Sequence, residues 1–243
     1  MDKNQCLKCT RRDSEVMRIV ISIGGSVLFP ELSKERVKGY AEGIDQIVSE
    51  GHSMGIVVGG GKIAREYIGV AREFGSDEIT LDQIGIAVTR VNAQTLMACV
   101  DYEFGQLPPE SYESAKHILQ QEGMVIMGGI APGQTTDAVG AALAEYSNAD
   151  LLIYATSVDG VYSSDPKVDE NATKFDKITP SELIEIIVGT EMVAGNAAPV
   201  DLLAAKLIER SRIKTIVIDG SNPKNMVDAV LHDKYNGTII NSD

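Results

Sequence analysis

The chain contains 243 residues, 44% of them hydrophobic and 23% charged, and this composition excludes an intrinsically disordered protein. Twenty-two basic and 35 acidic residues give a formal net charge of −13, and a field of this sign repels nucleic acids and anionic membranes. We therefore expect neither as a partner. An anionic substrate must instead be held by backbone amides, a few cations or a metal ion.

The apolar segments are short and the cysteines are few. No apolar run approaches the roughly 18 residues that a membrane-spanning helix needs. The first residues contain no apolar core of a secretory signal. Three cysteines cannot build a disulfide framework. Together these features indicate a cytoplasmic protein.

Residues 1–16 are polar and lack periodicity, so we expect them to form a flexible N-terminal extension. Within it, Cys6 and Cys9 form a Cys-x-x-Cys pair. A structural zinc site needs four ligands, and the chain offers only Cys99 and three scattered histidines besides this pair. We therefore favour a plain extension over a metal or redox site.

From residue 17 onward, apolar strand patterns alternate with helix patterns. Strands are predicted at residues 17–23, 55–58, 124–127, 151–155, 215–218 and 238–240. Helices are predicted at residues 33–50, 62–74, 80–100, 136–147 and 200–211, with further helix starts at residues 179 and 222. Ser33 is a predicted N-cap. Capping boxes are predicted at Thr80 with Gln83 and at Thr179 with Glu182.

Continuous apolar strands, each followed by a helix, are typical of a mostly parallel sheet with both faces covered. The sequence therefore predicts an α/β fold. Residues 156–180 are richer in Asp, Ser and Lys, and we expect them to form loops or a hairpin. The chain contains no internal repeat and no low-complexity linker, so we expect one domain with two lobes that divide near residue 150.

Three segments share one design, in which an apolar strand runs into a glycine-rich turn and then a helix. Glycine has no Cβ, so backbone N–H groups can face a ligand, and the helix N-terminus adds about half a positive charge. Ligands usually bind at this carboxyl edge of a parallel sheet. The turns therefore predict phosphate-binding loops. They are Ile23-Gly24-Gly25-Ser26, Val58-Gly59-Gly60-Gly61-Lys62 and residues 127–137.

Two familiar nucleotide signatures fit poorly. A P-loop is absent, because Ile63 follows Lys62 and Ile56 stands where its first glycine belongs. Residues 59–64 match the dinucleotide pattern G-x-G-x-x-A, but a strand and a full helix precede the strand that leads into it, which disfavours a dehydrogenase. No Ser-His-Asp or Cys-His set is evident.

Residues 156–166 suit either an exposed loop or a platform for a nucleotide base and a metal.

Six stretches between residues 17 and 240 occur in the order of a known family. They are Ile23-Gly24-Gly25-Ser26, Val57 to Lys62 with Ala64 to Tyr67, Ile84 to Ile86 with Thr89 to Ala93, Gly128-Gly129 with Thr135 to Asp137, Val158 to Tyr162 with Asp165-Pro166, and Asp201 to Lys206. On these stretches the chain resembles the amino acid kinase superfamily and, within it, the archaeal type of uridylate kinase. The resemblance does not cover residues 1–16.

This resemblance implies a three-layer α/β/α sandwich with a mostly parallel central sheet. Residues 17–243 are then one amino acid kinase domain, with an acceptor-nucleotide lobe at 17–150 and an ATP lobe at 151–243. The resemblance also implies a homohexamer that transfers the γ-phosphoryl group of ATP to UMP, yielding UDP for pyrimidine nucleotide synthesis. Mg²⁺ is expected to bind through the ATP phosphates, with no metal site in the protein itself.

The resemblance also assigns binding residues position by position. The ATP phosphates are expected at Gly25, Ser26, Gly61 and Arg65, and the adenosine end at Thr156, Tyr162 and Asp165. UMP is expected at Gly60, Asp82, Ile130, Ala131, Pro132, Gly133, Gln134, Thr135 and Thr136. Facing glycine turns can hold two anions in line, as phosphoryl transfer requires. Asp82 can accept hydrogen bonds from ribose hydroxyls.

Many kinases of this superfamily carry a first-strand lysine where this chain has Ser22, a departure that the archaeal type shares. Another group must therefore neutralise the transferring phosphoryl group. Lys62 at a helix start is our first candidate and Lys206 the second, with Mg²⁺ plus backbone amides as a third alternative. Asp159, which begins a turn at the nucleotide pocket, is the other candidate catalytic residue. Asp201 stands where acetylglutamate kinases carry a further lysine.

Two alternative functions stay open. Isopentenyl phosphate kinases place a histidine soon after the triple glycine, where this chain has Arg65 and Glu66, and no histidine occurs between His52 and His117. Molybdenum storage proteins share the fold and bind ATP without catalysis. This chain lacks the histidine-rich lining that their oxide clusters would need. A UMP kinase is therefore the favoured function.

Overall fold

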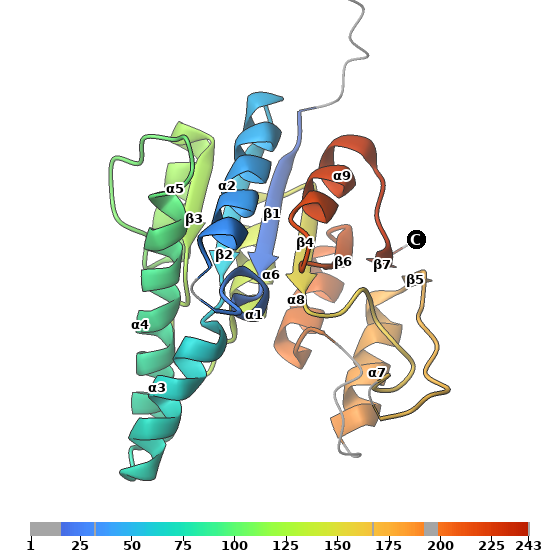
Figure 1. Ribbon diagram of the computed structural model, residues 1–243. Coiled ribbons are helices and arrows are strands. Elements are labelled where there is room, and N and C mark those ends of the chain that lie inside the picture. Colours follow the sequence, from blue (N-terminus) through green and yellow to red (C-terminus); the bar gives the residue numbers. More distant parts are fainter. Residues whose placement is uncertain (1–15, 32, 167, 192–198, 243) are drawn as a thin grey trace, which may run out of the picture.

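The computed structural model describes residues 16–31, 33–166, 168–191 and 199–242. Within these ranges the strands are β1 Arg18–Ile23, β2 Ser53–Val58, β3 Met124–Met127, β4 Leu151–Thr156, β5 Lys177–Ile178, β6 Thr215–Asp219 and β7 Gly237–Ile240. They form one sheet in the order β3-β2-β1-β4-β6-β7-β5 (Figure 1). Neighbouring strands run parallel except β6 and β7. The prediction of a mostly parallel sheet is therefore confirmed.

Helices cover both faces of the sheet. In the described part of the chain they are α1 Gly25–Leu28, α2 Lys34–Ser49, α3 Gly61–Glu73, α4 Glu78–Met97, α5 Tyr112–Glu122, α6 Thr136–Ser147, α7 Pro180–Glu191, α8 Leu202–Ser211 and α9 Lys224–His232. One apolar cluster joins the sheet to α2, α4 and α9, and a second joins the opposite face to α5, α6, α7 and α8. This is the three-layer α/β/α arrangement (Figure 1).

The central strand β1 shows why the apolar pattern is continuous. Ile19, Ile21 and Ile23 pack in one cluster, whereas Val20 packs in the other, and all four are fully buried. Successive side chains of a strand point to opposite faces, so a strand covered on both sides needs an apolar residue almost everywhere. Apart from the partly buried Arg18 at its start, the polar residue of β1 is Ser22, which is buried and lies one residue from the carboxyl end of the strand.

Helix starts account for most of the boundaries. Ser33 caps α2 as predicted, with its hydroxyl accepting a hydrogen bond from the Arg36 amide at 3.4 Å. The capping box before α7 is also confirmed. The Glu182 amide donates to the Thr179 hydroxyl at 3.2 Å, and the Glu182 carboxylate accepts from the Thr179 amide at 2.7 Å.

The predicted capping box at Thr80 and Gln83 is wrong. Helix α4 begins two residues earlier, and its N-cap is Asp77, whose carboxylate accepts from both the amide and the hydroxyl of Thr80 at 3.0 Å. A charged acceptor at the positive end of a helix is a stronger cap than a hydroxyl. Thr80 is therefore a first-turn residue that donates to the cap.

Two further elements were not anticipated. Helix α5 is capped by Ser111, which accepts from the Ser114 amide at 3.2 Å, and it ends at Gly123 with a φ of +77°. Strand β5 pairs with β7, and an antiparallel bridge joins Tyr162 to Lys174. The excursion over residues 156–180 therefore contains part of the expected hairpin.

Two other expectations concern the chain ends and membranes. The N-terminal extension and the Cys6–Cys9 pair lie outside the described residues, except for Val16, which is exposed. Across the residues that the structure describes, every helix is too short or too polar to span a bilayer.

We predict that Asp77→Ala lowers the melting temperature by a few degrees, because the first turn of α4 loses its cap. Gln83→Ala, at an exposed position of the same helix, is the matched control and should leave the melting temperature nearly unchanged. Thermal unfolding followed by circular dichroism measures both. A larger loss for Gln83→Ala than for Asp77→Ala would contradict the assignment of the cap.

Candidate active site

Two of the three glycine turns pack directly against each other at the carboxyl ends of β1 and β2. A Cβ on Gly25 would lie 2.5 Å from the carbonyl oxygen of Gly59, and one on Gly59 would lie 2.5 Å from the amide nitrogen of Gly25. Gly61 has a φ of +66°, and a Cβ there would lie 2.7 Å from the carbonyl carbon of Gly25. Only glycine fits these positions, and their close approach brings the starts of α1 and α3 together.

These two helix starts leave amides for a ligand. The amides of Gly24 and Gly59 are bonded to the carbonyls of Ala155 and Ile23, each at 2.9 Å. Among the described residues, no side chain caps α1 or α3, whereas α2, α4, α5, α6 and α8 all have side-chain caps. The first-turn amides of α3, together with those of the adjoining turn, can therefore receive an anion.

The third glycine turn differs in its use of glycine. A Cβ on Gly128 would lie 2.5 Å from the hydroxyl oxygen of Thr89 in α4, and the Gly129 amide donates to that hydroxyl at 2.7 Å. The glycine pair thus allows close packing against α4, and the Gly129 amide is already used. Ligand-facing groups of this loop must come from residue 130 onward.

Residues 130–136 form a polar loop that Asp82 joins from α4. The Gly133 amide donates to the Asp82 carboxylate at 2.7 Å, across 51 positions of sequence, and Gly133 has a φ of +77°. Tyr112 donates its hydroxyl to the Gln134 side-chain oxygen at 3.1 Å. Thr135 caps α6 by accepting from the Ala138 amide at 3.1 Å. The structure therefore brings together the predicted acceptor residues, which are Gly60, Asp82 and 130–136, around the start of α4 and α6.

A buried carboxyl that the sequence reasoning did not select lies beside this loop. Asp137 accepts a hydrogen bond from the Ser22 hydroxyl at 3.0 Å. Burial raises the pKa of Asp137 to about 7, against the lowering effect of the Ser22 bond, and the negative charge of Asp201 raises it further. Asp201 caps α8 and accepts a hydrogen bond from the Thr135 hydroxyl. The sequence signal was an acid in the first turn of a helix after a glycine loop.

The candidate cations lie at the surface near the glycine turns or on α8. Lys62, in the first turn of α3, is exposed and lies 3.6 Å from the Glu66 carboxylate. Arg65, also exposed, forms no ion pair with any described residue. Lys206 pairs with Glu209 at 3.1 Å on α8. Lys62 and Arg65 are thus the cations that α3 carries next to the open amides.

The predicted adenosine residues lie on the excursion that follows β4. Thr156 ends β4, and the Tyr162 hydroxyl donates to the Asp159 carboxylate at 2.7 Å. Lys174 contacts the same carboxylate at 3.1 Å. Burial raises the pKa of Asp159, but the hydrogen bonds from Tyr162 and Lys174 outweigh it and leave the pKa below its usual value. The Asp159 carboxylate therefore fastens the loop that carries Tyr162 and Asp165.

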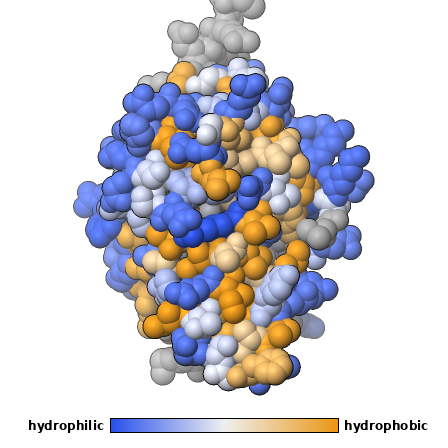
Figure 2. All heavy atoms as spheres, turned by 90° about the vertical axis from the view of Figure 1, so that its left-hand side faces the viewer, coloured by the Kyte–Doolittle hydropathy of each residue, from blue (hydrophilic) through white to orange (hydrophobic). Residues whose placement is uncertain are grey.

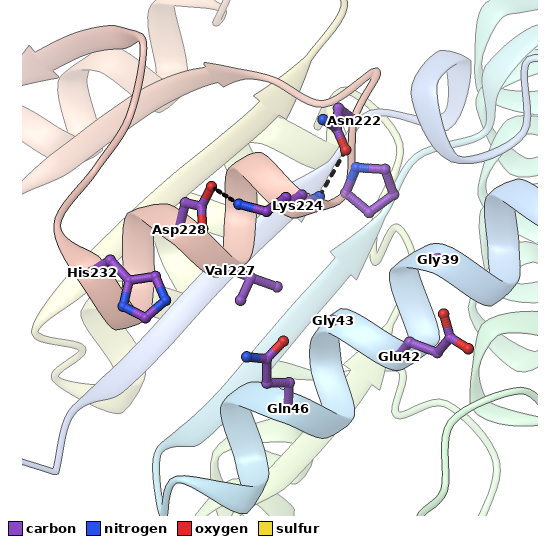
Figure 3. A pocket seen from close by; sticks show the side chains of 10 residues that line it. Gly39, Glu42, Gly43, Gln46, Asn222, Lys224, Val227, Asp228 and His232 are labelled. Carbon is purple, nitrogen blue, oxygen red and sulfur yellow. Dashed lines mark hydrogen bonds and ion pairs between the residues drawn. The ribbon is translucent and has the colours of Figure 1, made fainter.

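A separate cavity of about 440 Å³ lies between α2 and α9 (Figure 3). It is lined by Gly39 and Gly43 on one side and by Pro223 and Lys224 on the other, and Lys224 is paired with Asp228. None of the predicted site residues lines it. This cavity is therefore separate from the site that the sequence predicts at the glycine turns.

Open amides at the carboxyl edge of a parallel sheet, with a second loop beside them, are typical of phosphate-binding sites in proteins of the α/β class. A model of the amino acid kinase family matches residues 17–219, and the chain belongs to that family. It is 51% identical over 224 residues to a uridylate kinase of Haloarcula marismortui, covering 92% of this chain and 98% of that protein. A uridylate kinase of Halobacterium salinarum is 52% identical over 92% of this chain and 93% of its own length.

Solved structures agree with this assignment. The uridylate kinase from Archaeoglobus fulgidus superposes with a TM-score of 0.81 at 45% identity, covering 92% of this chain and all of that one. The UMP kinase from Bacillus anthracis superposes with a TM-score of 0.77 at 25% identity, covering 93% of this chain and 96% of its own. The predicted amino acid kinase fold is therefore confirmed.

We predict that Asp137→Asn changes the pH dependence of stability. The folded-state pKa of Asp137 is raised above the value of the unfolded chain, so the folded protein holds an extra proton between about pH 4 and pH 7. Stability falls as the pH rises through this window, because the buried carboxyl then ionises. Asparagine cannot ionise, so the variant should melt several degrees above the parent at about pH 8 and close to it at about pH 4.

Melting curves of the ligand-free protein at both pH values measure this difference, with the exposed Glu73→Gln as the matched control. An equal shift at both pH values would contradict the prediction, because it would show that folding does not change the pKa of Asp137.

Proposed function

We propose that this chain is a UMP kinase, which transfers the γ-phosphoryl group of ATP to UMP and yields ADP and UDP for pyrimidine nucleotide synthesis. The observation that carries the proposal is the pair of packed glycine turns, whose open amides adjoin a second polar loop. Relatives named uridylate kinase, about half identical over 92% of the chain, support it.

On the donor side, we place the ATP phosphates at Gly25, Ser26 and Gly61, with Arg65 as their side-chain cation. Each hydrogen-bond donor aimed at developing charge in a dry site contributes about 3 kcal/mol to the transition state. The adenosine end is assigned to Thr156, Tyr162 and Asp165, on the loop that Asp159 and Lys174 fasten. The adenosine end then lies in the proposed ATP lobe, residues 151–243, whereas the ATP phosphates lie on turns of the acceptor lobe, residues 17–150.

On the acceptor side, we assign UMP to Gly60, Asp82 and residues 130–136. One oxygen of Asp82 already holds the Gly133 amide, which leaves the other oxygen for ribose hydroxyls. A site built to bond a hydroxyl rejects analogues that lack it, because its buried polar groups are then unpaired.

The charge of the transferring phosphoryl group needs a partner, and Lys62 with Mg²⁺ is the combination we propose. Magnesium prefers oxygen ligands and keeps several waters. The carboxylates of Asp137 and Asp201 and the hydroxyl of Thr135 form an oxygen donor set next to the acceptor loop, and no described Lys or Arg side chain forms an ion pair with either carboxylate. This chemistry suits a magnesium ion held mainly by ATP phosphates, which supplies positive charge to the phosphoryl oxygens.

The isopentenyl phosphate kinase alternative receives no support from the histidines. His52 is buried, and its Nδ1 accepts a hydrogen bond from the Met17 amide at 3.1 Å. His117 lies on α5. For the storage alternative, the described residues contain no group of three or more His, Cys, Asp or Glu side chains suited to a metal. Within them, the one free cysteine is the exposed Cys99, which fits the reducing cytoplasm where we place the enzyme.

We also propose that the enzyme is a homo-oligomer, consistent with the hexamer that the family resemblance implies. Tyr67 and Val70 on α3 and Phe74 at its C-cap recur at three- and four-residue spacing and are 61%, 60% and 87% exposed. Ile79 and Val91 on α4 are also exposed. Figure 2 shows apolar side chains gathered on this face of the molecule. We propose that a second copy of the chain covers it.

The direct test of the activity measures ADP release from Mg-ATP with UMP, CMP, dUMP and isopentenyl phosphate as acceptors. We expect turnover with UMP. Turnover of isopentenyl phosphate without turnover of UMP would overturn the proposal in favour of the rival kinase. Tight ATP binding without turnover of any acceptor would favour the storage alternative.

Two variants separate the donor and acceptor sites. Arg65→Ala should raise the KM for ATP at least about tenfold and leave the KM for UMP nearly unchanged, because it removes a charged contact to phosphate. Asp82→Asn should do the reverse. If either variant shifts the KM for the other substrate instead, the two sites are misassigned.

The oligomer is tested by light scattering on a sizing column. Phe74→Glu should shift the protein toward a smaller species, because a buried carboxylate has no partner in an apolar contact. Val188→Glu, an exposed apolar position on α7, is the control and should leave the mass unchanged. A monomeric parent protein would contradict the proposed assembly.

A further inference from the structure

One face of α4 contacts both of the loops that we assign to the two nucleotides. Asp82, Gly85, Thr89 and Asn92 lie three or four residues apart, so they share one face of the helix. The Asp82 carboxylate accepts a hydrogen bond from the Gly133 amide of the acceptor loop, and Gly85 lies against Ile68 of α3. Farther along the helix, Thr89 and Asn92 reach the glycine turns themselves.

Asn92 binds the turn that leads into α3. Its side chain is 4% exposed, and its amide nitrogen donates to the Gly59 carbonyl at 2.9 Å and to the Gly60 carbonyl at 3.2 Å. A buried side-chain amide is costly unless its donors are bonded. Here both hydrogen bonds go to the main chain of one turn, which fixes the orientation of the peptide groups that join Gly59 to Gly60 and Gly60 to Gly61.

Thr89 contacts both loops. Its hydroxyl accepts from the Gly129 amide at 2.7 Å and donates to the Ile86 carbonyl at 2.6 Å. Its methyl carbon would lie 3.5 Å from a Cβ on Gly60. The side chain is 6% exposed, so it fills the space between the two loops. Arg90 adds a hydrogen bond to the Gly129 carbonyl at 3.3 Å.

We propose that Thr89 and Asn92 are positioning residues for phosphoryl transfer, which hold the turn 59–61, where Gly60 is assigned to UMP and Gly61 to ATP, at a constant separation from the loop 128–136. This inference rests on the proposed function. In-line transfer requires the reacting atoms to lie about 3–3.5 Å apart, and a displacement of about 1 Å can cost a hundredfold in rate. Thr89 and Asn92 supply that constraint from a rigid helix, and neither is assigned to a substrate.

A purely structural role would not require these residue types. One turn farther along the same face, Ala93 and Leu96 are fully buried and apolar. Only where the face meets the loops does it become polar. The side chain of Asn92 donates hydrogen bonds to the main chain of the turn 59–61. The hydroxyl of Thr89 accepts a hydrogen bond from the main chain of the loop 128–136.

The experiment compares steady-state kinetics and melting temperatures of Thr89→Val and Asn92→Ala with those of the parent. Valine keeps the shape of threonine but cannot bind the Gly129 amide. We expect kcat to fall about 10- to 100-fold in each variant, with both KM values within about threefold of the parent. Thr89→Ser keeps the hydroxyl and should recover most of the lost turnover.

Thr95→Val is the matched control. Thr95 lies on an exposed face of α4, and its hydroxyl donates to the Val91 carbonyl at 2.8 Å within the helix. This variant should leave kcat unchanged. An unchanged kcat in Thr89→Val and Asn92→Ala would overturn the proposal. The proposal would also be overturned if the loss of kcat followed the loss of melting temperature equally in Thr89→Val, Asn92→Ala and Thr95→Val.

Amide hydrogen exchange separates this inference from the proposed function. We expect faster exchange across residues 59–62 in Asn92→Ala and across 128–133 in Thr89→Val, measured without nucleotide. If the parent fails to phosphorylate UMP, the proposed function is wrong. The exchange data then still show whether Thr89 and Asn92 fix the two loops. Unchanged exchange rates in both segments would overturn the positioning role of Thr89 and Asn92, whichever substrate the enzyme uses.

Discussion

The main chain of Gly25 packs against that of Gly59 and Gly61 with no side chain between them, and the candidate site depends on this contact. The parallel pairing of β1 with β2 brings both turns to the same edge of the sheet. Because a Cβ at any of the three positions would collide with the opposite main chain, the two helix starts can approach only through glycine. Their uncapped amides then face one region, where a phosphate group can receive several hydrogen bonds at once.

Phosphate binding by backbone amides suits a chain with a net charge of −13. Peptide dipoles create a local positive potential without adding cations to the surface. Polar side chains at the end of β1 and near the third glycine turn bind one another in the same region. Ser22 bonds Asp137 at the end of β1, and Asp201 and Thr135 join the two helix starts on the opposite face of the sheet. Burial raises the pKa of Asp137, and the negative charge of Asp201 raises it further, so the positive charge of a magnesium ion brought by ATP would stabilise both carboxyls.

The elements with strong local signals could be predicted from the sequence. Met124–Met127 and Thr136–Ser147 form the predicted strand and helix without any shift of their ends. The start of α4 was misplaced because two neighbouring caps competed, and the charged one, Asp77, prevailed. The roles of Asp137, Thr89 and Asn92 were not found, because each depends on a partner at least 32 positions away in sequence. Likewise, glycine at 128 signals close packing with α4, and nothing local distinguishes that use from phosphate binding.

A crystal structure with ADP and UMP bound tests the central claim most directly. The account predicts the ADP phosphates against the amides of Gly25, Ser26 and Gly61, and the UMP phosphate against residues 130–136, with the two nucleotides in line between the loops that α4 holds. Phosphates bound instead by surface lysines, or in the cavity between α2 and α9, would contradict it.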